Sequence, residues 1–237
     1  MKTNVMNSKY LFAAILLVLS SIMASGQSVG SVFNTLDATY SSVRQKQIMD
    51  RYDQSTNENA FSLNYSQARQ IFASNPVYVQ YGLGLQYSYH VNKDQDDVNY
   101  NGTMISGGFT VLTSFLSAKL PVNIMYCIPV FDTSLTLMPF AGFNLQGYFL
   151  GRQKDTEWIS INGDRETIVD KTNLFNSDQM GGNPLNRITV GWQAGAKLAI
   201  GRYLLGVAYE GPLSNLQKGD TYKVRRSQVN ICLGYMF

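Results

Sequence analysis

Six stretches of the chain alternate apolar and polar residues with the period of a β-strand. In "VYVQYGLGLQYSYHV", residues 77–91, Val, Tyr and Leu occupy every second position, and Tyr, Gln, Gly, Ser and His lie between them. Successive side chains of a strand point to opposite faces of the sheet, so each stretch predicts a strand with one wide apolar face. The six predicted strands are 77–91, 114–128, 134–151, 187–200, 202–212 and 225–237.

The second face of these strands carries Gly, amides and few charges, where the water-facing side of a soluble sheet would carry Lys and Glu. A soluble ligand-binding barrel turns its apolar face inward. A membrane barrel turns that face to lipid and keeps a compact polar interior. The pattern favours the membrane barrel. It predicts an outside position for Leu83, Val122, Phe143 and Leu233.

The connections between these strands alternate in length. Those at 129–133 and Gly201 are short. The long polar connections, which we expect to be outer loops, are 92–112, 152–186 and 213–224. Outer-membrane barrels have short periplasmic turns, long outer loops and an even strand number. We therefore expect an all-β, up-and-down antiparallel transmembrane β-barrel of eight strands, with two more at 59–68 and within 30–53, where "SSVRQKQIMDRYDQ" fits a polar helix almost as well.

The N-terminus has the pattern of an export signal. Lys2 and Lys9 precede the apolar run at 11–23, and "ASG" follows it. The run is shorter than the roughly 20 residues of a membrane-spanning helix, which favours a cleaved signal peptide. We expect residues 1–26 to be removed by cleavage near Gly26 and Gln27. The barrel then occupies 27–237, and the pattern is least defined over 27–58.

Composition agrees with a chain that is not surrounded by water alone. Charged residues make up 15% of it, against about a quarter in soluble proteins. Removal of residues 1–26, which hold two Lys and no acid, leaves a net charge of +1 and gives no reason to expect a nucleic-acid partner. Lipid-side aromatic residues gather near the predicted strand ends, as membrane interfaces favour. They are Tyr126, Tyr203, Tyr235 and Phe237 at one rim and Tyr87, Tyr89, Phe149 and Tyr209 at the other.

Three segments resemble a known family. "FLSAKLPVNIMY", "MPFAGFNLQGYF" and the terminal "ICLGYMF" are similar to the small Gram-negative outer-membrane β-barrel family that includes PorT-like proteins, over roughly residues 77–237. The resemblance implies an integral outer-membrane protein, and some members belong to secretion machinery. The final strand also resembles the C-terminal signal recognised by the barrel-insertion machinery. The residues of this candidate assembly signal are Val229, Ile231, Leu233, Tyr235 and Phe237.

The interior face holds a candidate lumen charge cluster, Lys119, Lys197 and Glu210. Lys119 and Glu210 fall at similar height, which predicts a buried pair. Such a pair could serve ion or proton passage, but a structural salt bridge is favoured because side chains fill an eight-strand interior. Cys127 and Cys232 point inward from opposite walls, beyond the about 7 Å that a disulfide spans. Two free, buried thiols are expected.

The remaining motifs indicate neither an enzyme nor a metal or cofactor site. His90, the one histidine, lies near the outer rim without a recognisable catalytic partner. The stretch 94–102 fails as a calcium loop because Val98 takes the fifth ligand position and no Glu stands at the twelfth. Residues 157–171 predict a hairpin around the Asn-Gly pair at 162–163, able to bind a partner by strand addition or to form only a stiff loop.

The expected function follows from these patterns. We expect an integral outer-membrane protein with a structural or interaction role, acting through its extracellular loops or in an envelope or secretion assembly, with a lumen packed by side chains. Its expected partners are outer-membrane lipid, the barrel-insertion machinery during assembly and an envelope protein. Two alternatives remain open: a narrow transport pore, and a rim enzyme that uses His90.

Overall fold

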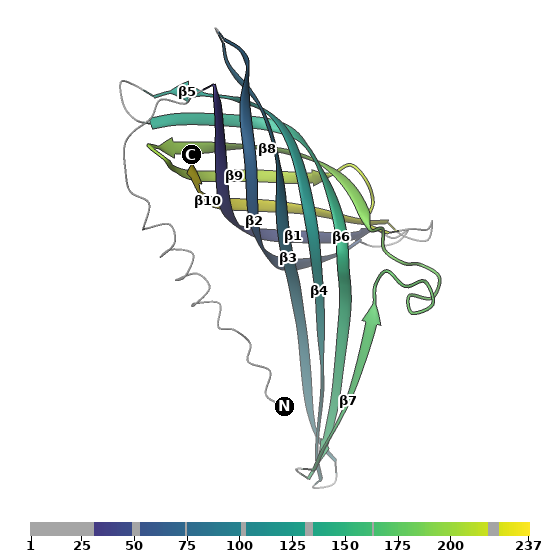
Figure 1. Cartoon of the computed structure of the whole chain (residues 1–237). Coiled ribbons are helices and arrows are strands. Elements are labelled where there is room, and N and C mark those ends of the chain that lie inside the picture. The colour runs from purple at the N-terminus through teal and green to yellow at the C-terminus, as the bar shows by residue number, and fades with distance from the viewer. Residues whose placement is uncertain are drawn as a thin grey trace.

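Eight long antiparallel strands close into a barrel (Figure 1). The computed structural model describes residues 31–48, 53–73, 75–100, 103–130, 135–162, 164–217 and 223–237. Its strands are β1 (Val32–Ile48), β2 (Asp53–Phe72), β3 (Asn75–Tyr100), β4 (Thr103–Tyr126), β5 (Ile128–Pro129), β6 (Leu135–Ile161), β7 (Asp164–Asn173), β8 (Ile188–Ile200), β9 (Tyr203–Pro212) and β10 (Lys223–Met236). Among these described residues, no helix has the length and hydropathy to cross a membrane.

Consecutive long strands pair around the barrel, and β10 pairs with β1 to close it. Their register runs from Thr35 opposite Met236 to Ile48 opposite Lys223. The last residue continues the seam, since the backbone N–H groups of Phe237 and Asn34 each donate to the carbonyl of the other at 2.9 Å. The barrel wall therefore has no open edge within the membrane.

The fold prediction is confirmed, including the two strands expected in the first third. The segment predicted within 30–53 forms β1 and not a helix, and the strand predicted at 59–68 extends in both directions to become β2. Of the ten strands, β5 only continues β4 and β7 pairs only with β6, which leaves eight in the barrel wall. The predicted signal peptide, residues 1–26, lies outside the described residues.

The large apolar side chains lie on the outside of the barrel. Leu83, Val122, Phe143 and Leu233 are 52, 53, 62 and 46% exposed. Polar side chains on the opposite face, such as that of Gln86 at 2%, are buried. A broad apolar outer surface around a polar interior is stable in hydrocarbon and not in water. The chain is a membrane-spanning β-barrel.

Glycines on the inner face leave room for longer polar side chains from neighbouring strands. A Cβ atom at Gly234 would lie 2.0 Å from Asp37 Oδ1, and one at Gly206 would lie 2.6 Å from Cys232 Sγ and 3.0 Å from Lys197 Cγ. The lumen is too narrow for side chains at every inward position. This crowding explains the Gly content of the inner face.

The predicted outer loops are partly wrong, because three strands continue far beyond the membrane. Residues 92–112 were expected to be a loop, but they extend β3 and β4 to a tip with Tyr100 opposite Thr103. The alternation is lost here, because residues 92–97 are all polar and the next apolar residue, Val98, lies on the opposite face from Val91. β3, β4 and β6 have 26, 24 and 27 residues, whereas about 10 cross a membrane.

The second predicted loop, 152–186, also begins as strand. β6 runs to Ile161 and β7 returns from Asp164, with Asn162 in the left-handed region at φ 51°. This is the two-residue hairpin that the Asn-Gly pair predicted. Residues 174–187 form an irregular segment between β7 and β8. In the third predicted loop, 213–224, the described residues 213–217 are irregular, and 223–224 already belong to β10.

The depth of the apolar belt can be tested with two matched substitutions on β3. We expect Leu85→Arg, at the middle of the belt, to lower the free energy of unfolding by about 2–4 kcal/mol, and Val91→Arg, at its edge, by about 0–1 kcal/mol. Both side chains face outward and are more than a third exposed. Urea unfolding in phosphatidylcholine vesicles measures both. Equal costs would contradict the assigned depth.

Candidate functional site

The short-turn end of the lumen is filled by apolar side chains. They are Phe33, Ala68, Tyr78, Met125, Cys127, Met138, Ala199, Leu204 and Met236, with Phe140 packed against them. This corrects the prediction of a polar interior, which fails at the short-turn end. These residues share the inner face with the amides and Gly, so strand alternation alone places them inside.

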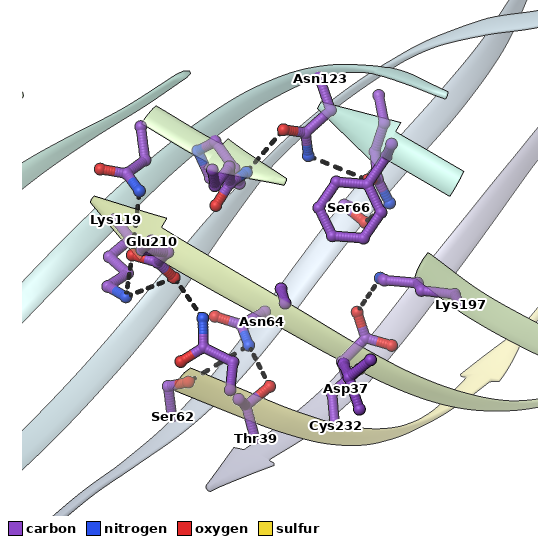
Figure 2. A pocket seen from close by; sticks show the side chains of 18 residues that line it. Asp37, Thr39, Ser62, Asn64, Ser66, Lys119, Asn123, Lys197, Glu210 and Cys232 are labelled. Atoms are coloured by element: carbon purple, nitrogen blue, oxygen red, sulfur yellow. Dashed lines mark hydrogen bonds and ion pairs between the residues drawn. The ribbon is translucent and has the colours of Figure 1, made fainter. Parts of the chain in front are cut away.

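The middle of the lumen holds the ion pair that the sequence predicted. Lys119 Nζ lies 2.8 and 3.0 Å from the two carboxylate oxygens of Glu210. Asn144 and Asn230 donate to the same carboxylate at 2.9 and 2.6 Å. Figure 2 shows this group bridging β4 and β9 across the barrel interior. The carboxylate is saturated with donors, which offsets the cost of burying it.

The third member of the predicted cluster pairs elsewhere. Lys197 Nζ lies 2.6 Å from Asp37 Oδ2, linking β8 to β1 (Figure 2). A further pair that the sequence analysis missed joins Arg226 of β10 to Glu58 of β2. The Arg226 guanidinium also donates to Ser88 at 3.0 Å. The described residues thus place three ion pairs in the lumen, each between a buried cation and a buried anion.

Amide chains fill the space between the pairs. Gln193 donates to Asn123 at 2.6 Å, Asn123 to Gln80 at 3.2 Å, and Gln80 to Ser66 at 2.8 Å. Cavities of about 90 and 30 Å³ remain between these side chains, and each is large enough for at least one water.

A second apolar cluster caps the opposite, long-loop end. It consists of Phe115, Tyr148, Leu174, Leu185, Leu216 and Val224, with Phe175 and Met180 packed against it. Backbone bonds from Leu185 to Leu174 at 2.9 Å and from Leu216 to Val224 at 2.7 Å hold the crossing segments in place. The Arg226 guanidinium stacks 4.8 Å from the ring of Phe115, beneath this cap. Apolar clusters therefore lie at both ends of the lumen.

The cysteines and the histidine lie where the sequence placed them. Cys127 and Cys232 are buried and free, as expected. His90 Nδ1 lies 2.7 Å from the carbonyl oxygen of Asn57. Among the described residues, no side chain suited to catalysis hydrogen-bonds to this ring.

All five residues of the candidate assembly signal lie on the outward face, because Tyr235 is opposite Leu36 and Tyr203, which are 39 and 45% exposed. Val229, Ile231, Leu233 and Phe237 are about half exposed, but Tyr235 is 6% exposed. The prediction of Tyr235 as a lipid contact is therefore wrong. Tyr203 and Phe237 flank its ring at centroid distances of 5.8 and 6.4 Å, and Arg202 donates to its hydroxyl at 3.2 Å.

A four-stranded sheet projects beyond the barrel on the long-loop side (Figure 1). This projecting sheet consists of residues 91–98 of β3, 105–112 of β4, 154–161 of β6 and 164–171 of β7, paired in the order β3–β4–β6–β7. Eight residues at about 3.4 Å each give it a length of roughly 27 Å. Within the described residues, the outer edges of β3 and β7 have no strand partner here.

Comparison with known proteins finds similarity only in structure. No family model matches the chain, and no curated protein matches it in sequence. Ail, the attachment invasion locus protein of Yersinia pestis, has 14% identity over 88% of this chain and 100% of its own, with a TM-score of 0.37. Neisserial surface protein A has 13% identity over 89% and 100%, with a TM-score of 0.33.

The N-terminal β-barrel domain of Pseudomonas aeruginosa OprF has 12% identity over 85% of this chain and 97% of its own, with a TM-score of 0.27. None of the three reaches a TM-score of 0.5. The assignment to a barrel of the outer-membrane type therefore rests on the closed antiparallel sheet and the outward apolar belt of this chain.

The central ion pair generates a stability prediction. We expect Glu210→Gln to lower the free energy of unfolding by about 3–5 kcal/mol, because Lys119 is left buried without a counter-charge. The double variant Lys119→Met/Glu210→Gln should regain part of the loss. The control is Asp53→Asn, which breaks the exposed pair with Lys46 and should cost about 1 kcal/mol or less. An unchanged urea midpoint for Glu210→Gln would contradict the structural role of the pair.

Proposed function

We propose that the chain is an outer-membrane interaction protein, in which the barrel is a sealed anchor and the projecting sheet is the contact element. The observation that carries this proposal is the exposure of large apolar side chains beyond the membrane. They are Val98, Phe109, Ile159, Ile161 and Ile168, each 38–64% exposed. Clustered apolar exposure in water is a mark of interaction surfaces.

The two alternatives have less support. A narrow pore needs a continuous path, whereas this lumen has two apolar plugs and small cavities. A rim enzyme needs a group that activates or orients His90, whose hydrogen-bond partner is a backbone carbonyl. We therefore propose a non-enzymatic role without cofactor.

The proposal also covers the assembly of the barrel and the kind of partner that it contacts. The outward residues Val229, Ile231, Leu233 and Phe237 would serve the barrel-insertion machinery as the C-terminal signal and then contact outer-membrane lipid. The segments "FLSAKLPVNIMY" and "ICLGYMF" resemble PorT-like proteins. On this resemblance we propose that the partner belongs to an envelope or secretion assembly.

A conductance measurement separates the sealed barrel from the pore. We expect the purified chain to give no stable current steps in planar lipid bilayers, because side chains fill the lumen between the two plugs. A porin inserted under the same conditions is the positive control. Reproducible steps of a single size would reject the sealed lumen.

The contact role of the projecting sheet can be tested by shortening it. Lys93 pairs with Thr110 and Thr156 with Val169, so replacement of 94–109 and of 157–168 by Asn-Gly keeps both hairpin registers. We expect the shortened chain to fold and insert, because no residue of the barrel wall is removed. Heat-dependent mobility in detergent gels reports folding.

Photo-crosslinking in intact cells of the native host then reports contacts. A photoreactive residue at Ile168 or Phe109 should crosslink to protein, and one at Leu85, within the belt, should not. If the projecting sheet contacts a partner, cells that carry the shortened chain should also lose the phenotype that depends on that partner. The absence of protein crosslinks from the projecting sheet would overturn the proposed function.

A further inference from the structure

The projecting sheet has two chemically different faces. Because registers are continuous across its four strands, each face can be assigned from the pairing. The lumen-side face continues the inward positions of the barrel, and a bulge at Phe149 keeps β6 in phase with β4. The outward face continues the lipid-facing positions. Each face has sixteen residues, four from each strand.

The lumen-side face combines an apolar centre with carboxylates. Its apolar residues are Val98, Ile105, Phe109, Val111, Ile159, Ile161 and Ile168. Its acidic residues are Asp94, Asp96, Asp155, Glu157, Asp164, Glu166 and Asp170. The face contains no Lys or Arg, and none of these carboxylates forms an ion pair with a described residue.

The outward face has the opposite character. It carries Lys93, Lys154, Arg165 and Lys171 with a single acid, Asp97, among Gly, Ser, Thr, Gln and three aliphatic residues, Val91, Leu112 and Val169. Its one large aromatic side chain, Trp158, lies beneath the guanidinium of Arg165 at 4.3 Å. The apolar side of the same strands therefore changes from the outward face in the membrane to the lumen-side face beyond it.

Folding gives no reason for this change. Lipid requires apolar residues outside the barrel, but beyond the membrane both faces of the sheet meet water and no described segment covers the lumen-side face. The apolar residues are contiguous. Val98, Ile105 and Ile161 lie side by side in one row, and Ile159 follows along β6 towards Ile168 of β7.

We propose that the lumen-side face of the projecting sheet binds a cationic amphipathic segment of another protein, whose apolar side covers the isoleucines and whose Lys and Arg side chains meet the carboxylates. The inner strands β4 and β6 carry five of the seven apolar residues, and the edge strands β3 and β7 carry five of the seven acids. An apolar centre with a polar rim is typical of a protein interface. Charge selects the occupant, because a second copy of the same face would bring like charges together. This inference rests on the proposed function and names the partner class.

Strand addition at the edges is the competing mode. Half of the ten residues of β7 are charged, as Asp164, Arg165, Glu166, Asp170 and Lys171 show. Charged edge strands resist pairing with another strand. The face, which exposes Ile168 at 64%, is the better contact.

A binding experiment with a defined probe tests the inference. The full chain in phosphatidylcholine nanodiscs is titrated with a labelled alternating Lys–Leu decapeptide, with a Glu–Leu peptide and empty nanodiscs as controls. We expect binding of the Lys–Leu peptide only, weakened by salt. The variant Asp94→Asn/Asp96→Asn/Asp164→Asn/Glu166→Gln should lose at least about tenfold in affinity and most of the salt dependence.

Two further variants separate surface chemistry from folding. Ile159→Ser/Ile168→Ser should lose about tenfold and keep the salt dependence, since only apolar contact is removed. The matched outward-face variant, Asp97→Asn/Val169→Ser, should bind as the parent does. Heat-dependent gel mobility must show all variants folded. Equal affinity for both peptides, or no effect of neutralising the four acids, would overturn the inference.

The native partner supplies a second readout. Crosslinks from a photoreactive residue at Ile168 in intact cells are mapped to the contacted segment of the partner. This segment should be rich in Lys and Arg, and the crosslinks should be lost in the neutralised variant. Crosslinks to an acidic or uncharged segment would overturn the inference and leave the proposed function standing. If the projecting sheet gives no crosslink to any protein, both the inference and the proposed function are overturned.

Discussion

Closure of the sheet between β1 and β10 is the constraint on which the rest of the structure depends. Inside a bilayer each unpaired backbone N–H or C=O costs several kcal/mol, so a spanning sheet must have no edge. The seam from Ile48 and Lys223 to Asn34 and Phe237 satisfies these groups along its length. With eight strands the closed wall encloses a space that side chains can fill. The chemistry of the interior follows from that limited width.

A narrow interior tolerates buried charges only when each is paired with an opposite charge. The three buried ion pairs join strands that are not neighbours, β4 to β9, β8 to β1 and β10 to β2, so each ties one part of the wall to another. An unpaired charge in this space would be strongly destabilising, whereas a matched pair costs much less. The Lys119–Glu210 pair is fully hydrogen-bonded, but Asp37 Oδ1 and Arg226 Nε have no hydrogen-bond partner among the described residues. The contribution of the pairs is therefore to fix which side chains meet. Apolar clusters lie above and below the network, at the two ends of the lumen.

How far the sequence predicts this arrangement depends on how local each feature is. Period-two alternation gave the wall strands and the inward position of Lys119 and Glu210, because both depend only on strand phase. It did not give Asp37 as the partner of Lys197, since that pairing needs the phase of β1, whose polar sequence also fits a helix. The burial of Tyr235 was missed because Tyr203, Phe237 and Arg202, which cover it, are brought there by neighbouring strands and the turn at Gly201. The prediction of a loop at 92–112 was wrong because pairing with a neighbouring strand outweighs the low intrinsic β-propensity of these polar residues.

The projecting sheet depends on the barrel for its stability. Both of its faces meet water and its two edges are open, so it lacks the buried core that an isolated sheet needs. β3, β4 and β6 enter it directly from the membrane, where their pairing is fixed by closure and register, and the same ladders continue outward. This support allows a face to carry exposed isoleucines and unneutralised carboxylates, which would be unfavourable in a free-standing sheet. The barrel thus supports a sheet whose exposed isoleucines and carboxylates are not part of a core of its own.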